Sequence, residues 1–275
     1  MNPDVNNYGK KCAELLERVR SKHPLIHHLT NYVVMNDTAN LTLAFGASPV
    51  MAHAKEEVAE MVSMAGALVL NPGTLSADWV DSMLEAGKKA NELQVPIIYD
   101  PVGVGATHFR NETGKKFLKN LQLSIIRGNS GEMGALAGMG GVVKGVDSVE
   151  GVKDPARVCS LLARNNRCVA VITGKRDILS DGQHVIGVDN GNAMLSHITG
   201  TGCMATSAIA VFKAVEEDSL LAAGAALAIY GLASEIAAKT ASGPGTLRVG
   251  LMDAVYNLTP EEVEKGVRIV ELETV

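Results

Sequence analysis

The chain has 275 residues and carries 25 Lys and Arg against 30 Asp and Glu, which gives a formal net charge of −5 at pH 7. This acidic balance argues against a general nucleic-acid-binding surface, because phosphate binding needs a basic stripe. A hydrophobic content of 47% together with a low net charge excludes intrinsic disorder.

Strand-like and helix-like segments alternate along the first half of the chain. Apolar residues at helical spacing predict a helix over residues 12–20, and Gly46 closes a second helix that begins at residue 33. Ser76 is a typical N-cap for a third helix, which extends to about residue 93. Short apolar runs predict strands at residues 25–27, 48–52, 67–71 and 95–100. Between the second and third of these strands, the acidic pair Glu56-Glu57 indicates the start of a helix, because negative charge is favourable at a helix N-terminus.

The same alternation continues in the second half. Strands are predicted at residues 124–127 and 168–173, and helices at 130–137, 155–165, 203–215, 220–239 and 247–258. Asp189-Asn190-Gly191 is a strong hairpin signal, so residues 183–189 and 194–198 are predicted to be a pair of extended segments. The pattern indicates an α/β fold, a mostly parallel central sheet covered by helices on both faces. We therefore expect one three-layer α/β/α domain over residues 1–275, with ligands beyond the carboxyl ends of the strands.

The sequence also bears on the compartment. No charge-free apolar run of about 18 residues predicts a membrane span, and the longest apolar stretch, residues 220–233, is typical of a buried helix. The first residues contain no apolar signal-peptide core. The spacing of the four cysteines fits neither CxxC nor zinc ligation, which favours reduced thiols in a cytoplasmic protein.

The strongest local signal is Thr199-Gly200-Thr201-Gly202-Cys203, between an extended segment and an apolar helix. Two glycines let the backbone approach a ligand, and the helix start offers free N–H groups to an anion. A tight strand-to-helix turn without a ligand explains the same pattern. A thiol at a helix N-terminus is expected to have a lowered pKa, so Cys203 is a candidate nucleophile, base or polar contact, or else a small buried residue.

Charged residues stand at other predicted strand ends. Asp100 ends a buried strand and Glu132 opens a helix, so both are candidates for holding Mg²⁺ directly or through water. Turn capping explains Asp100 equally well, and compensation of the helix dipole explains Glu132. Arg127 at a strand end could clamp a phosphate. His27 and His28 point in opposite directions on a strand and lack a partner ligand, which disfavours a metal role.

Several nucleotide and hydrolase motifs are missing from the sequence. It contains no Gly-x-x-x-x-Gly-Lys-Ser/Thr, no Gly-x-Gly-x-x-Gly after the first strand, and no Gly-x-Ser-x-Gly. These absences argue against a P-loop kinase, a first-strand dinucleotide-binding domain and an α/β-hydrolase. The residues alone favour an anion-binding α/β enzyme.

Seven motifs spread from residue 29 to residue 246 make the sequence resemble the hydroxyethylthiazole kinase family of the ribokinase-like superfamily. They are Leu29-Thr30-Asn31-Tyr32-Val33-Val34, Gly46-Ala47-Ser48-Pro49-Val50-Met51, Asp100-Pro101-Val102-Gly103-Val104-Gly105-Ala106, Ile126-Arg127-Gly128-Asn129, Ile172-Thr173-Gly174, Thr199-Gly200-Thr201-Gly202-Cys203 and Gly243-Pro244-Gly245-Thr246. The resemblance implies a ribokinase-like fold and transfer of the γ-phosphoryl group of ATP, with Mg²⁺, to the hydroxyl of 4-methyl-5-(2-hydroxyethyl)thiazole in thiamine salvage.

The resemblance also implies roles for individual residues. Asn31, Met51 and Gly200 would bind the thiazole, while Arg127, Asn129 and Thr173 would bind ATP. Asp100 and Glu132 would organise Mg²⁺, and Gly202 and Cys203 would belong to the catalytic anion hole. The family is trimeric, so a homotrimer with the substrate site at a subunit boundary is expected. The wider superfamily usually has Asp where Cys203 stands, and we expect this thiol mainly to position the acceptor hydroxyl.

Two other functions fit the same sequence. A sister vitamin kinase would act on hydroxymethylpyrimidine or pyridoxal, although the segments around Asn31 and Met51 favour the thiazole. A non-catalytic nucleotide-binding regulator would keep the fold without turnover.

Overall fold

The computed structural model describes residues 7–139, 142–144, 147–150 and 152–273. Within this part of the chain, nine strands form one sheet in the order β11-β10-β9-β8-β5-β4-β3-β1-β2, and β6 pairs separately with β7. The strands are β1 (Leu25–Leu29), β2 (Ser48–Val50), β3 (Ala67–Leu70), β4 (Ile97–Tyr99), β5 (Ile125–Asn129), β6 (Val142–Lys144), β7 (Asp147–Glu150), β8 (Val169–Thr173), β9 (Asp177–Ser180), β10 (Val185–Val188) and β11 (Ile269–Leu272).

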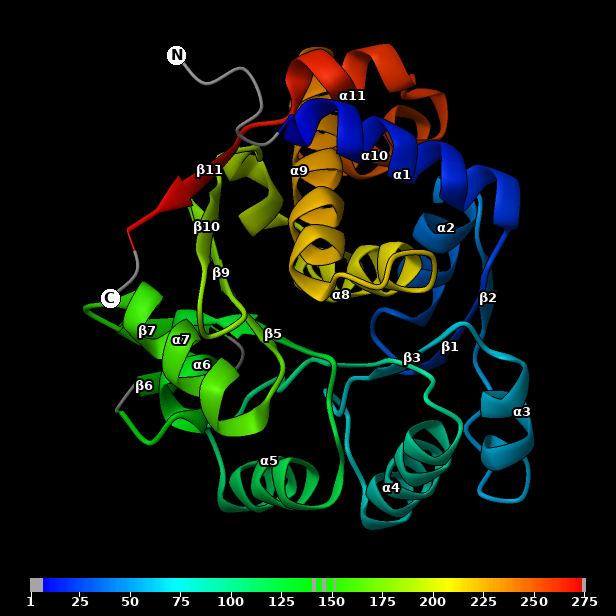
Figure 1. Cartoon of the computed structure of the whole chain (residues 1–275), viewed down its shortest axis with the longest axis vertical. Coiled ribbons are helices and arrows are strands. Elements are labelled where there is room, and N and C mark those ends of the chain that lie inside the picture. Colours follow the sequence, from blue (N-terminus) through cyan, green and yellow to red (C-terminus); the bar gives the residue numbers. More distant parts are fainter. Residues whose placement is uncertain (1–6, 140–141, 145–146, 151, 274–275) are drawn as a thin grey trace.

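The sheet is parallel from β2 to β8 and antiparallel from β8 to β11. Strands such as β3 are buried along their whole length, because helices cover both faces, as Figure 1 shows. The helices are α1 (Tyr8–Lys22), α2 (Met35–Phe45), α3 (Val58–Met64), α4 (Ala77–Glu92), α5 (His108–Asn120), α6 (Ser130–Leu136), α7 (Pro155–Asn166), η1 (Ala193–His197), α8 (Thr201–Lys213), α9 (Ser219–Ala238), α10 (Pro244–Asn257) and α11 (Pro260–Gly266).

Two hydrophobic clusters lie on opposite sides of the sheet. One contains buried residues of α1, α2, α8 and α9, and the other contains those of α3, α4, α5 and α7. The predicted three-layer α/β/α arrangement with a mostly parallel sheet is therefore confirmed. Gly46 ends α2 and Ser76 caps α4 as predicted, the Ser76 hydroxyl accepting a hydrogen bond from the Trp79 N–H.

The predicted hairpin at Asp189-Asn190-Gly191 is wrong. β10 pairs with β9 on one side and with β11 on the other, while residues 193–197 form the 3-10 helix η1. The Asn190 side chain accepts from the Arg268 N–H (2.6 Å) and donates to the Gly266 carbonyl (3.0 Å). Asn190 therefore fastens the end of β10 to the segment before β11 instead of turning the chain back on itself.

Helix α9 lies in the protein core. It is 20 residues long and apolar enough, by length and composition, to cross a membrane, with a mean hydropathy of 1.7 in its most apolar window. However, 78% of that window is buried inside the structure. This burial agrees with the core helix predicted for residues 220–239.

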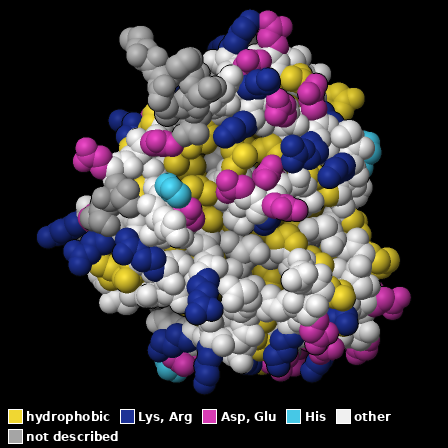
Figure 2. Space-filling model, viewed as in Figure 1, with side chains coloured by type: hydrophobic (Ala, Val, Ile, Leu, Met, Phe, Trp, Pro, Cys, Tyr) yellow, Lys and Arg dark blue, Asp and Glu magenta, His cyan; other side chains and the backbone are white. Residues whose placement is uncertain are grey.

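Acidic and basic side chains are interspersed over most of the face drawn in Figure 2. Among the charged residues that the structure describes, Lys116 Nζ pairs with Asp81 Oδ1 at 3.2 Å and Arg18 Nη1 pairs with Glu216 Oε2 at 3.0 Å, so opposite charges also neutralise one another in pairs.

Replacing Gly231 by alanine is expected to destabilise the fold through overpacking of α9. A Cβ at this position would lie 2.5 Å from the Asn190 carbonyl oxygen, so backbone would have to move, which costs about 1–3 kcal/mol. In the matched variant Gly224→Ala, the new Cβ meets the flexible end of Ile186 at 3.0 Å and that of Ile269 at an ordinary 3.7 Å, and the gain in helix propensity of about 1 kcal/mol offsets the closer contact. Urea unfolding of both variants tests this difference, and equal stabilities would contradict it.

Candidate active site

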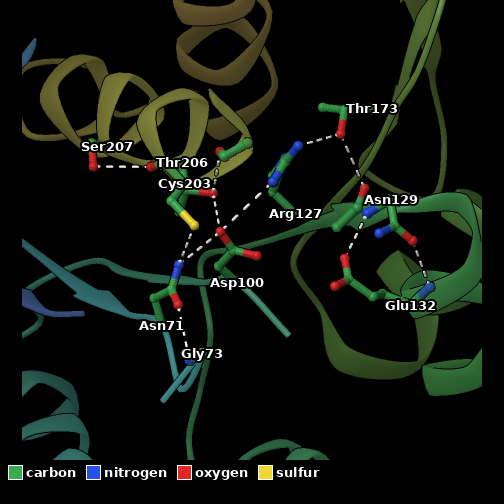
Figure 3. A network of polar contacts seen from close by, with 12 residues as sticks. Asn71, Gly73, Asp100, Arg127, Asn129, Glu132, Thr173, Cys203, Thr206 and Ser207 are labelled. Carbon is green, nitrogen blue, oxygen red and sulfur yellow. Dashed lines mark hydrogen bonds and ion pairs between the residues drawn. The ribbon is translucent and has the colours of Figure 1, made fainter. Parts of the chain in front are cut away.

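Polar side chains gather where the parallel strands end. Asn71 follows β3, Asp100 follows β4, Arg127 lies near the end of β5 and Thr173 ends β8. The first turn of α8, which carries Cys203, lies over this edge, and Figure 3 shows these side chains turned toward one another. The sheet edge therefore brings together residues that the sequence separates by as many as 132 positions.

Asp100 lies at the centre of this group, with only 1% of its surface exposed. Its Oδ2 accepts hydrogen bonds from Thr206 Oγ1 (2.8 Å) and Asn71 Nδ2 (3.1 Å) and lies 3.7 Å from Arg127 Nη1. Burial raises the pKa of Asp100, and the nearby Arg127 guanidinium and the two hydrogen bonds oppose this effect. Its Oδ1 is buried without a hydrogen-bond partner among the described residues, so this oxygen is available to a ligand.

Glu132 combines a capping role with a place near Asp100. Asn129 and Glu132 form a capping box at the start of α6, and the second oxygen of Glu132 accepts from the Gly103 N–H at 2.7 Å. Burial raises the pKa of Glu132 to about 7, and the Asp100 carboxylate contributes to the rise. Glu132 thus lies in the first turn of α6, where the sequence predicted compensation of the helix dipole, and it also takes part in a capping box that was not predicted. The same side chain also joins α6 to the loop after Asp100.

Asp100 and Glu132 offer the kind of oxygen ligands that would suit one divalent cation shared with a bound phosphate. Among the described residues, no cluster of three or more His, Cys, Asp or Glu side chains could enclose a metal ion. Mg²⁺ in phosphoryl-transfer sites usually binds one or two carboxylates together with substrate phosphates and water. Asp100 Oδ1 meets this requirement directly. Both oxygens of Glu132 already accept backbone N–H groups, so Glu132 is suited to act through water.

Cys203 accepts hydrogen bonds at its sulfur from two amide side chains. Asn71 Nδ2 lies 3.1 Å and Asn31 Nδ2 3.6 Å from Sγ. Burial and the neighbouring Asp100 charge raise the pKa of the Cys203 thiol to about 12. The sequence-based expectation of a lowered pKa is wrong, because desolvation and a nearby carboxylate outweigh the helix N-terminus.

The two glycines before Cys203 serve different purposes. Gly200 directly precedes α8 and has φ +84°, a left-handed backbone conformation that residues other than glycine rarely adopt. Gly202 lies against Arg127, and a Cβ there would be 2.8 Å from Nη1. The turn therefore lets the guanidinium lie directly beside the start of α8, which supports the anion-site interpretation of the motif.

Arg127 is buried between Asp100 and Thr173. Its Nη2 donates to Thr173 Oγ1, and its Nε has no partner among the described residues. Asp177, at the start of β9, accepts from the Gly174 N–H at 2.9 Å and so shapes the turn after Thr173. Burial raises the pKa of Asp177 from 3.8 to about 6, against the opposing effects of that N–H and of Arg127.

Asp177→Asn is expected to remove a pH-dependent loss of stability. The folded protein keeps the Asp177 proton up to about pH 6, whereas the unfolded chain releases it near the ordinary pKa of 3.8. The stabilisation by this proton is complete below pH 3.8 and is lost as the pH rises through 6. The free energy of unfolding of the wild type should fall relative to that of the variant over this interval by about 3 kcal/mol. Urea unfolding across the interval measures the difference, and parallel pH profiles would contradict it.

Met51 lies apart from this group. It follows β2, the edge strand, whereas Asn71 follows β3 on the far side of β1. His53 links the Met51 segment to the end of β1, because its Nδ1 contacts the Met51 carbonyl at 3.2 Å and its Nε2 accepts from the Thr30 N–H at 3.3 Å. The structure therefore places Met51 near the Asn31 segment but not in the Asp100 network.

Asn71 and Thr206 belong to the site although no role was assigned to them from the sequence. Asn71 joins the two parts of the site, because its Nδ2 donates to both Asp100 and Cys203 and its Oδ1 accepts from Asn31 Nδ2 at 2.9 Å. The available signal was its position directly after a buried strand, which Asp100 shares. Thr206 lies one turn after Cys203 on α8, so helical spacing from the glycine turn could have indicated it.

A separate groove of about 850 Å³ lies at the amino ends of the parallel strands, opposite the candidate active site. Its lining includes residues that precede β3, β4 and β5, namely Gly66, Pro96 and Ser124, together with the end of α8. These are the amino ends of the strands. The groove therefore lies away from the polar network at the carboxyl ends, where ligands bind in open parallel sheets.

A model of the hydroxyethylthiazole kinase family matches residues 16–261. The chain belongs to the hydroxyethylthiazole kinase family. It is 56% identical over 269 residues to a protein named hydroxyethylthiazole kinase from Desulforudis audaxviator, covering 98% of both chains. It is 55% identical over 267 residues to one from Chloroflexus aggregans, covering 97% of this chain and 96% of the relative.

Solved structures agree with this family and with the ribokinase-like fold. Hydroxyethylthiazole kinase protein from Pyrococcus horikoshii OT3 is 40% identical and superposes with a TM-score of 0.89, covering 96% of this chain and all of that one. Pyridoxal kinase from Staphylococcus aureus in complex with pyridoxal has a TM-score of 0.64 at 14% identity, covering 90% of this chain and 98% of that one, which shows a shared fold alone. The resemblance inferred from the motifs is confirmed, and the chain is a kinase-family enzyme.

Proposed function

We propose that this hydroxyethylthiazole kinase family member transfers the γ-phosphoryl group of ATP to the hydroxyl of 4-methyl-5-(2-hydroxyethyl)thiazole, giving the thiazole phosphate used to make thiamine diphosphate. The observation that carries the proposal is Asn71, whose amide donates to both Cys203 and Asp100. It joins a neutral thiol, suited to an alcohol, to a buried carboxylate–guanidinium pair, suited to a metal-bound phosphate. Names of relatives at 55% and 56% identity support the same substrate.

Asp100 would hold Mg²⁺ through its unpartnered Oδ1, with Glu132 acting through water. When bound, the ion supplies charge neutralisation to the phosphates of ATP. Asp100 also fixes Arg127 by charge and Thr206 by a hydrogen bond. This side chain thereby sets the relative positions of the start of α8 and the end of β5.

Arg127, Thr173 and Asn129 would bind the ATP phosphates at the ends of β5 and β8. Arg127 is oriented by Thr173 and lies against Gly202, so its guanidinium is beside the start of α8. Negative charge that develops during transfer would meet this guanidinium and the Gly200–Cys203 turn together.

Asn31, Gly200 and Cys203 would hold the acceptor. The Cys203 thiol stays protonated at neutral pH because burial raises its pKa to about 12, so it is a poor base. Its sulfur accepts from Asn71 and Asn31, which fixes its position beside the transfer site. Cys203 would therefore place the acceptor hydroxyl, and the loose transition state makes little demand for a strong base.

Cys203→Ala is expected to lower kcat by about 10-fold, less than the 10²–10⁴-fold that general acid–base catalysis supplies. Cys203→Asp should remain active, because a carboxylate can also accept from Asn71 and contact the hydroxyl. Steady-state kinetics at saturating ATP and thiazole measure both variants. A complete loss of turnover in Cys203→Ala would overturn the positioning role.

The direct test of the proposed function is an ATP-consumption assay with the thiazole alcohol, hydroxymethylpyrimidine and pyridoxal as acceptors. Turnover is expected with the thiazole, accompanied by its phosphate ester in the product mixture. Turnover with another acceptor alone would indicate a sister vitamin kinase. ATP binding without turnover on any alcohol would indicate a regulator.

We also propose a cytoplasmic homotrimer in which the thiazole binds at a subunit boundary. Tyr32 and Val33, next to Asn31, are 71% and 61% exposed, and apolar surface of this kind is suited to contact a second copy. Met51, on the edge-strand side, would then complete the thiazole site of a neighbouring copy. Light scattering measures the mass in solution, and a monomer that is fully active would contradict this assembly.

A further inference from the structure

Arg110, in the first turn of α5, joins two loops of the candidate active site. Its Nη1 donates to the carbonyls of Pro72 (3.1 Å) and Val102 (2.7 Å), and its Nη2 donates to the carbonyl of Gly73 (2.7 Å). Pro72 and Gly73 belong to the loop after β3, and Val102 belongs to the loop after β4. One guanidinium therefore connects the carboxyl ends of two neighbouring parallel strands.

Each of these loops fixes a different part of the site. In the first loop, the Gly73 N–H donates to Asn71 Oδ1 at 3.1 Å, which helps orient the amide that contacts Cys203 and Asp100. In the second loop, the Gly103 N–H donates to Glu132 Oε1 at 2.7 Å. Arg110 therefore fixes the position of Asn71, which contacts Cys203, relative to that of Glu132, without contacting either side chain through its own hydrogen bonds.

The chain around Arg110 is shaped for a guanidinium. Gly103 has φ +75°, and a Cβ there would lie 2.9 Å from Arg110 Cδ, so the loop passes directly over the arginine side chain. The neighbouring Asn111 Oδ1 accepts from the Gly105 N–H at 2.7 Å, which gives the same loop a second attachment to α5. A planar fork with several donors can satisfy three carbonyls at once, whereas a lysine ammonium cannot reproduce this geometry.

We propose that Arg110 is a positioning residue for phosphoryl transfer, which holds the loop after β3 and the loop after β4 in register so that Asn71 and Glu132 face the reacting groups. The role rests on the proposed kinase function. Since small displacements of catalytic groups can cost about 10²-fold, loss of this contact should lower kcat well beyond its effect on substrate binding.

The test compares Arg110→Ala and Arg110→Lys with Lys116→Ala, all on α5. Lys116 is the matched control, because its Nζ pairs with Asp81 of α4 on the exposed surface. We expect kcat with ATP and the thiazole to fall by about 10-fold to 100-fold in both Arg110 variants, with a higher Mg²⁺ requirement. Added guanidinium at non-denaturing concentration should restore part of the rate in Arg110→Ala only, and Lys116→Ala should match the wild type.

Hydrogen exchange supplies a readout that does not depend on the substrate. The amides of Gly73 and Gly103 should exchange faster in Arg110→Ala and slow again with guanidinium. If the wild type fails to phosphorylate the thiazole, the proposed function fails while this measurement still tests the loop contact. The proposal would be overturned if Arg110→Ala had the same kcat, the same Mg²⁺ requirement and the same amide exchange rates as the wild type. If that variant does not fold, the same results in Arg110→Lys would overturn it.

Discussion

Asp100→Asn is expected to lower kcat for phosphorylation of the thiazole alcohol by about 10³-fold. The asparagine keeps the shape of the side chain and can still accept from Thr206, but it no longer offers a charged oxygen at the Oδ1 position. It also leaves Arg127 without the carboxylate that lies 3.7 Å from its Nη1. Both the cation and the phosphate-binding guanidinium therefore lose the group that places them.

The fold should survive this substitution. Burial raises the pKa of Asp100, so a neutral side chain of equal size avoids the cost of a buried carboxylate, although it lowers stability by leaving the buried Arg127 guanidinium without its partner. Asp81→Asn is the matched control, because Asp81 is an exposed carboxylate on α4 that pairs with Lys116. Rates measured over a Mg²⁺ titration decide the matter. A folded Asp100→Asn enzyme within about tenfold of the wild type would rule out Asp100 as the metal-holding group.

The order of strands and helices explains why much of this site was predictable. Apolar runs separated by helices required a parallel sheet, and a parallel sheet brings the carboxyl ends of β4, β5 and β8 to one side. Asp100, Arg127 and Thr173 were therefore expected together before any contact was known. The contacts of Arg127 with Asp100 and Thr173 confirm that expectation.

Other features depend on contacts that local patterns do not encode. Asn190 stands in a strong turn sequence, yet its side chain bonds to Gly266 and Arg268, far along the chain, and no hairpin forms there. The helix start at Cys203 predicted a lowered thiol pKa, but burial of the thiol, together with Asp100 brought in by another strand, raises it instead. Burial determines the direction of the pKa shift here, because the low dielectric constant of the interior strengthens the repulsion between a Cys203 thiolate and the Asp100 carboxylate.

Gly202→Ala is expected to reduce kcat/KM for ATP by about 10²-fold. The added Cβ would lie 2.8 Å from Arg127 Nη1 and 3.0 Å from Nη2, so the guanidinium must move. It is held on its other sides by Thr173 and Asp100, and any shift therefore disturbs the phosphate site and the metal site together. The effect on folding should be small, since alanine in the first turn of α8 improves helix propensity.

The matched control is Gly250→Ala on α10, where the new Cβ would make an ordinary contact of 3.6 Å with Ala237. This variant gains the same helix propensity and should keep the wild-type rate. Initial rates over a range of ATP concentrations, together with the thermal shift produced by ATP, separate a damaged phosphate site from a destabilised fold. If Gly202→Ala bound and used ATP as the wild type does, Arg127 could not be the side chain that contacts the phosphates. The backbone N–H of residue 202 is retained in the alanine variant, so such a result would assign anion binding to the start of α8 alone.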